Sequence, residues 1–333
     1  MDALVQKFYK IYPDEFDMLI TFDVGKYNGQ YNAWSNGFMR RYVPSNIGYI
    51  DECDSVENRY CKGYPTRLRY TQHVSMESDP VVFSSYTFVH ELGHYWGVGW
   101  GNQHGQQCYD PWASYVYDFP SGHWSSNFEA GPLSVLVGGA LQTKNDTYPK
   151  PPRLSRIIDS KDGTFTSVDI EGGTTTERTR FNNIDLYAMG LMTKEELATK
   201  DMFVIYDLER KGSDGNIYYG VRKNITLGDF KTMLKQKSAC ENKNYYTGDG
   251  SRVLNSYDKG KELAKDFRIA FVFVKHPEQE ISNKKAREIC QAVNYDYPKA
   301  WNDATYGLST IHTYLSETSK NPDCKSLFPP SLD

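Results

Sequence analysis

The chain of 333 residues lacks several features that would assign it to a class directly. It has no run of 18 or more apolar residues, which argues against a membrane-spanning helix. Its six cysteines include no CxxC pair, which argues against a thiolate zinc site or a dithiol redox motif. The net charge is −4, so there is no electrostatic reason to expect nucleic-acid binding.

The N-terminus also lacks the apolar core of a signal peptide, because Met1 leads into a mixed polar stretch. We interpret the chain as the mature part of a secreted protein, without its signal peptide, whose cysteines form disulfides. The alternative is a cytosolic protein with six reduced cysteines. Cys53 and Cys61 bracket a short polar loop and could pair with each other, whereas the other pairings stay open.

Histidine is scarce, with 7 residues, yet two of them belong to an HExxH motif in residues 88–94, FVHELGH. On a helix, residues four apart share a face, so His90 and His94 can offer two imidazoles to one metal ion. Glu91 lies at the edge of that face, where it can reach a metal-bound water. The apolar neighbours favour a packed helix over one with two solvated histidines. Such ligands suit zinc, which in catalytic sites keeps one coordination position open for water.

Zinc needs a further protein ligand, which the local sequence does not supply. The metzincin peptidases extend the motif to HExxHxxGxxH; Gly97 is in place, but Trp100 stands at the position of the third ligand, and indole cannot bind zinc. The remaining candidates carry imidazole or carboxylate groups: His104, Asp110, His123, Asp118, Glu129 and Asp185, with His73 less suited.

A wider resemblance comes from the order of four segments: HELGHxxG (90–97), HWS (123–125), DGTF (162–165) and DLYAMG (185–190). This order resembles a group of secreted, mostly bacterial zincin-like metallopeptidases. The resemblance implies His123 as the third zinc ligand. Among the other candidates, Asp185 and His104 are the fallback ligands. We expect an α+β, zincin-like fold, in which the HExxH helix packs under an N-terminal sheet and a loop-rich, helical second lobe lies across a cleft.

Three residues of the DLYAMG segment are further candidates for the site. Met189 is similar to the methionine of the metzincin Met-turn, which lies beneath the metal; ordinary core packing is the alternative. Tyr187 could donate its phenol to an oxyanion, although 26 tyrosines make a single one weak evidence. Asp185 could orient a ligand histidine or cap the turn.

Periodicity and capping residues predict the main elements. We expect strands at 16–22, 202–206 and 269–274. We expect helices from 84 or 85 to 96, from 193, and at 226–237, 281–295 and 301–315, with a turn within 181–192 and loops with short strands at 98–180. No strong boundary divides residues 1–333, so we expect one catalytic domain with lobes at 1–98 and 99–333.

The sequence thus predicts a zinc-dependent endopeptidase with one catalytic Zn²⁺ and Glu91 as general base, acting on a protein or peptide substrate. Two alternatives stay open. One is a secreted binding module with a structural or degenerate zinc site, which a closed set of four ligands would favour. The other is a zinc hydrolase that acts on a non-peptide amide or ester.

Overall fold

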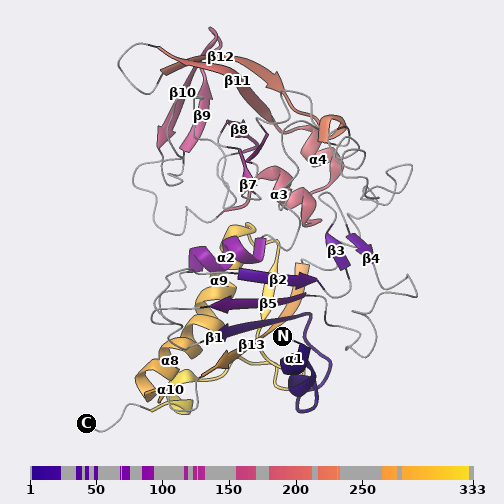
Figure 1. Ribbon diagram of the computed structural model, residues 1–333, viewed down its shortest axis with the longest axis vertical. Coiled ribbons are helices and arrows are strands. Elements are labelled where there is room, and N and C mark those ends of the chain that lie inside the picture. Colours follow the sequence, from indigo (N-terminus) through magenta and orange to yellow (C-terminus); the bar gives the residue numbers. More distant parts are fainter. Residues whose placement is uncertain are drawn as a thin grey trace. The chain divides into compact units, whose positions relative to one another are not determined.

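The fold is known from a computed structural model. It describes residues 2–23, 35–39, 42–44, 49–51, 68, 70–75, 85–93, 116–118, 123–125, 127–131, 155–169, 180–211, 217–230, 232, 265–275 and 280–329. The chain divides into two compact units. The first unit comprises Met1–Val43, Tyr49–Glu91 and Leu263–Asp333, and the second comprises Pro44–Gly48 and Leu92–Glu262. Figure 1 shows the elements of both.

The C-terminal part of the chain belongs to the first unit, whereas we expected residues 263–333 in one lobe with residues 99–262. The cause is strand pairing across a long sequence separation. β13 (Asp266–Val274) lies parallel to β1 (Met18–Asp23), and Asp17 Oδ2 accepts a hydrogen bond of 2.9 Å from Arg268 N, 251 residues away.

The sheet of the first unit has five strands in the order β14-β13-β1-β5-β2. Its other members are β14 (Thr310–His312), β5 (Tyr70–Ser75) and β2 (Ser35–Met39). All neighbours are parallel except β2, which runs antiparallel to β5 at one edge. Residues 18–22 of β1 are each 1% exposed or less, as expected for a central strand covered on both faces.

Helices cover the two faces of this sheet. On one face, Val5 of α1 (Asp2–Tyr9) packs with Leu19 and Ala270. On the other, Phe88 of α2 (Ser85–Gly93) stacks on Tyr297 of α9 (Tyr297–Ala304), with ring centroids 4.5 Å apart. The part of α2 that belongs to the first unit, which ends at Glu91, is thereby anchored there.

Parallel neighbours require a crossover connection, and the connection from β13 to β14 is helical. It runs through α8 (Asn283–Gln291), a π-helical turn (Ala292–Asp296) and α9. Ser282 caps α8, at the start of the helix expected at 281–295, by accepting Lys285 N at 3.2 Å. The expected helix at 301–315 is wrong in its extent: α9 ends at Ala304, and Thr310–His312 instead pairs with β13.

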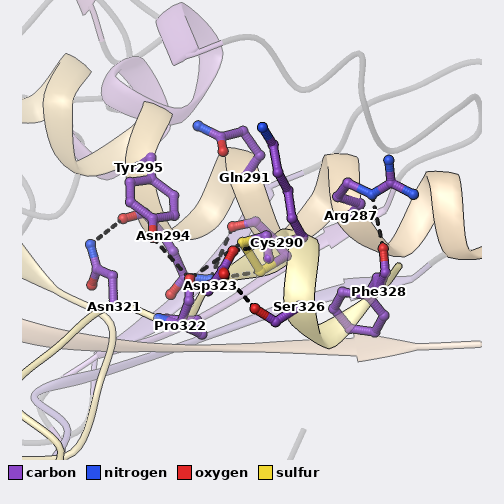
Figure 2. Close-up of a disulfide and its surroundings, with 12 residues drawn as sticks. Arg287, Cys290, Gln291, Asn294, Tyr295, Asn321, Pro322, Asp323, Ser326 and Phe328 are labelled. Atoms are coloured by element: carbon purple, nitrogen blue, oxygen red, sulfur yellow. Dashed lines mark hydrogen bonds between the residues drawn. A yellow bond between two sulfur atoms is a disulfide. The ribbon is translucent and has the colours of Figure 1, made fainter. Parts of the chain in front are cut away.

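A disulfide closes the C-terminal segment onto α8. Cys290 of α8 is joined to Cys324 of α10 (Cys324–Leu327), and both are buried. Figure 2 shows the hydrogen bonds around it, among them Arg287 Nε to the carbonyl of Phe328 at 2.9 Å. The predicted pair Cys53–Cys61 lies outside the described residues.

The second unit contains a five-stranded antiparallel sheet in the order β8-β11-β12-β10-β9. The strands are β8 (Phe128–Glu129), β11 (Phe203–Arg210), β12 (Ile217–Asn224), β10 (Thr164–Asp169) and β9 (Ser155–Asp159). The sheet curls so that its two edge strands, β8 and β9, come together. Glu129 Oε2 of β8 accepts a hydrogen bond from Ile157 N of β9 at 2.9 Å. Phe165, Phe203 and Ile205 fill its inner face.

The mixed architecture confirms the α+β class. Among the described helices, none is long and apolar enough to cross a membrane. Strand 202–206 and the helix starts at Thr193 and Thr226 are confirmed: Thr193 Oγ1 accepts Glu196 N at 3.0 Å, and Thr226 Oγ1 accepts Asp229 N at 3.2 Å. The helix from Thr226 is described at 227–230 and 232.

Candidate functional site

Helix α2 carries the first part of the HExxH motif. Phe88, Val89 and Leu92 are at most 1% exposed, whereas His90 and Glu91 are half-buried. This division follows from helical periodicity, because 88, 89 and 92 share one face and 90 and 91 lie off it. The core therefore takes the apolar residues and leaves the imidazole and the carboxylate partly accessible. His94 lies outside the described residues.

The backbone of His123 lies in a short hairpin, in the region where loops with short strands were expected. β7 (His123–Trp124) pairs antiparallel with β6 (Tyr117–Asp118), with Asp118 opposite His123. Ser125 N extends the pairing by donating to Val116 O at 2.9 Å. The side chain of His123 is outside the described part of the chain, so its role as a ligand stays a prediction.

The residue that follows His123 links two of the segments that carry the resemblance. Trp124 is 1% exposed and Asp185 is fully buried, and Trp124 Nε1 donates to Asp185 Oδ1 at 2.8 Å. The indole also packs against Phe128, with centroids 5.2 Å apart. The HWS and DLYAMG segments are thus joined within the second unit.

Asp185 lies in α3 (Asn183–Ala188), a short helix where we expected only a turn. Asn182 caps it: Asn182 Oδ1 accepts Asp185 N at 2.9 Å, and Asp185 Oδ2 accepts Asn182 N at 3.2 Å. Both carboxylate oxygens of Asp185 therefore accept structural hydrogen bonds, which hold the side chain within the second unit. The N-x-x-D pattern of a capping box was present in the sequence and would have predicted this helix.

Met189 and Tyr187 are both part of the interior of the second unit. Met189 is fully buried at the C-terminal end of α3, and Gly190 follows with a φ of +74°, which turns the chain. Tyr187 is 5% exposed. Burial, with a smaller contribution from the charge of Glu195, raises the pKa of Tyr187 to about 12. The phenol therefore keeps its proton at neutral pH and is a hydrogen-bond donor.

Other predicted candidates divide into two groups. Glu129 has a structural role, because Oε1 accepts Gly131 N at 3.1 Å while Oε2 holds β9. His104 and Asp110 lie outside the described residues, and so do the side chains of His73 and Asp118.

The DGTF segment forms the turn between β9 and β10. Asp162 Oδ1 accepts Thr164 N at 2.9 Å, Gly163 takes a φ of +84°, and Phe165 is 2% exposed in the core. These contacts are those of a side chain that stabilises a tight turn. This part of the resemblance has a structural explanation that needs no catalytic role.

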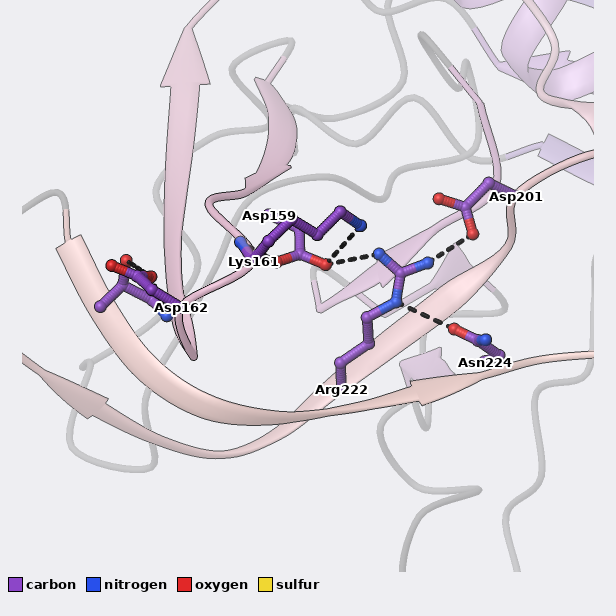
Figure 3. Close-up of polar contacts among 7 residues, drawn as sticks. Asp159, Lys161, Asp162, Asp201, Arg222 and Asn224 are labelled. Atoms are coloured by element: carbon purple, nitrogen blue, oxygen red, sulfur yellow. Dashed lines mark hydrogen bonds and ion pairs between the residues drawn. The ribbon is translucent and has the colours of Figure 1, made fainter.

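A charged network centred on Arg222 of β12, the middle strand of the same sheet, was not predicted (Figure 3). Arg222 donates to Asp159 Oδ2 at 2.6 Å, to Asn224 Oδ1 at 2.9 Å and to Asp201. Its guanidinium lies 4.0 Å from the centroid of the Phe203 ring. Burial raises the pKa of Asp159, but hydrogen bonds from Lys161 and Arg222 outweigh it and hold the pKa below its ordinary value.

No group of three or more His, Cys, Asp or Glu side chains that could hold a metal occurs among the residues that the structure describes. That set contains neither His94 nor the His123 side chain. Comparisons with protein-family models, with curated proteins and with solved structures found no match.

Proposed function

We propose that this protein is a secreted zinc-dependent endopeptidase with one catalytic domain. The observation that carries the proposal is the division of α2, which buries Phe88, Val89 and Leu92 and leaves His90 and Glu91 half-buried. An imidazole and a carboxylate that are half-buried on an otherwise packed helix suit a metal site. The same groups would suit it less well if they were fully solvated or fully buried.

The donor set fits zinc in its chemistry. His90, His94 and His123 would hold the ion, with Asp185 and His104 as fallback ligands. Trp124 supports His123 in this set, because its burial and its bond to Asp185 fix the backbone next to residue 123. Asp185 is the weaker fallback, since both its oxygens already accept hydrogen bonds.

Zinc bound there would activate a water molecule and polarise the scissile carbonyl. Glu91 takes a proton from the attacking water as general base and delivers it to the leaving amine as general acid. Tyr187, whose phenol is protonated at neutral pH as that of any tyrosine is, donates a hydrogen bond to the oxyanion. Met189 contributes an apolar floor beneath the ligands.

Export is the second part of the proposal. The Cys290–Cys324 disulfide is compatible with an oxidising compartment, where such bonds persist. A protein or peptide substrate would meet the enzyme there.

Zinc analysis tests the metal site. The purified protein should hold about one zinc per chain, and a His90→Ala/His94→Ala variant should hold none. If His123 is the third ligand, His123→Ala should bind zinc more weakly than wild type. His104→Ala should then bind zinc as tightly as wild type. Retention of zinc by the double variant would refute the site.

A further inference from the structure

A large apolar cavity lies in the first unit, on the sheet face that α1 covers. Its volume is about 960 Å³, which is within the range of small-molecule sites. Its walls come from three segments distant in sequence: α1 with the residues after it, β13, and residues 313–322. Leu4, Phe8, Val272 and Leu315 are only partly buried there, although they pack on the core.

The lining also carries charge of one sign. Lys7 and Lys320 are the charged side chains among the described residues that line the cavity, and both are exposed. No acidic side chain belongs to that described lining. An apolar chamber with cationic groups and no anionic ones is complementary to an apolar molecule that carries a negative charge.

One wall of the cavity is held by a chain of polar contacts. Tyr314 lines the cavity, and its hydroxyl lies 2.8 Å from His312 Nδ1. His312 Nε2 lies 2.5 Å from Asp266 Oδ1 at the start of β13. Ile11 and Tyr12 also line the cavity and are 76% and 45% exposed, and the Tyr12 ring stacks on Phe8 with ring centroids 4.7 Å apart.

We propose that this cavity binds a free alkyl carboxylate, with the chain against Phe8, Val272 and Leu315 and the carboxylate at Lys7 and Lys320. The proposal is independent of the zinc site, because none of its residues belongs to the HExxH motif.

Calorimetric titration with octanoate, decanoate and dodecanoate tests the apolar part. Affinity should rise about fourfold for each methylene added, as expected for burial of the chain. Val272→Trp, which places a bulky indole at a position that the alkyl chain would contact, should weaken binding. Thr318→Trp, at another lining position, serves the same purpose if the first variant does not fold by circular dichroism. Equal affinity for the three chain lengths would overturn the proposal.

A charge-reversed ligand and a lysine variant test the polar part. Dodecyltrimethylammonium should bind more weakly than dodecanoate. Lys7→Gln/Lys320→Gln should weaken dodecanoate binding about three- to tenfold, the range for exposed charge pairs. Lys194→Gln/Lys200→Gln, with two exposed lysines of the second unit, is the matched control and should change nothing. Unchanged dodecanoate affinity in the Lys7/Lys320 variant, or binding to phosphatidylglycerol vesicles without binding to free dodecanoate, would overturn the proposal.

Discussion

Trp124 and Asp185, 61 residues apart, are joined by a buried hydrogen bond of 2.8 Å. The bond ties the residue after His123 to the helix that precedes Met189. Asp185 thereby has two structural tasks, since its second oxygen caps α3 through Asn182 N. A single carboxylate thus organises two segments that we propose to lie at the zinc site.

Asp185→Ala should destabilise the protein by about 2–4 kcal/mol, because it removes a helix cap and leaves the buried indole N–H without an acceptor. Trp124→Phe should cost about 1–3 kcal/mol by removing the donor. Urea denaturation of the two variants measures both effects.

Glu196→Ala is the matched control for Asp185→Ala. Glu196 is also the third residue of a helix and also accepts its cap's N–H, from Thr193, but it is exposed. Its loss should cost at most about 1 kcal/mol. An Asp185→Ala variant no less stable than Glu196→Ala would show that the buried bond contributes little.

The Arg222 network should make stability depend on acid pH. The pKa of Asp159 in the folded state lies below its ordinary value of 3.8. Its ionisation therefore stabilises the fold above about pH 4, and this contribution is lost as the pH falls through the lowered pKa. Asp159→Asn should be less stable than wild type at pH 6, and the difference should shrink as the pH falls below 3.8, by urea denaturation across that range.

Asp201→Asn is the control, because Asp201 binds the same guanidinium but its side chain is 64% exposed, against 10% for Asp159. Exposed pairs contribute little, so this change should have the smaller effect at pH 6. If the two variants lose equal stability, burial does not determine the strength of this network.

Removal of the disulfide should destabilise the protein. The bond spans 34 residues, for which loop closure in the unfolded chain predicts about 3–4 kcal/mol. Cys290→Ala/Cys324→Ala should therefore unfold at a clearly lower urea concentration. Asn283→Ala, which loses a single exposed hydrogen bond to the carbonyl of Pro329, is a control in the same region and should change little. A double variant within about 1 kcal/mol of wild type would contradict this account.

Elements with a strong local signal could be predicted from the sequence. The apolar run of β1 and the capping serine of α8 are examples, since each acts within a few residues. The pairing of β1 with β13 could not, because it joins segments about 250 residues apart and no local pattern records it. The strand at Thr310–His312 has the same origin: pairing with β13 outweighed a helical pattern.

The roles of the candidate ligands could not be predicted from the sequence either. A carboxylate in the sequence has the same appearance whether it binds metal or backbone N–H groups. Asp185 and Glu129 were both candidate ligands, and burial with their hydrogen bonds reveals their structural roles. Helix α3 is a different case, since its capping box was visible in the sequence and was missed.

Comparison of wild type with Glu91→Gln tests the central claim most directly, by zinc content and by cleavage of a peptide library on the same preparations. Both proteins should bind about one zinc, and the variant should hydrolyse peptides about two to four orders of magnitude more slowly, because only the general base is lost. A variant that cleaves at nearly the wild-type rate, or a zinc-loaded wild type that cleaves no peptide, would contradict the account.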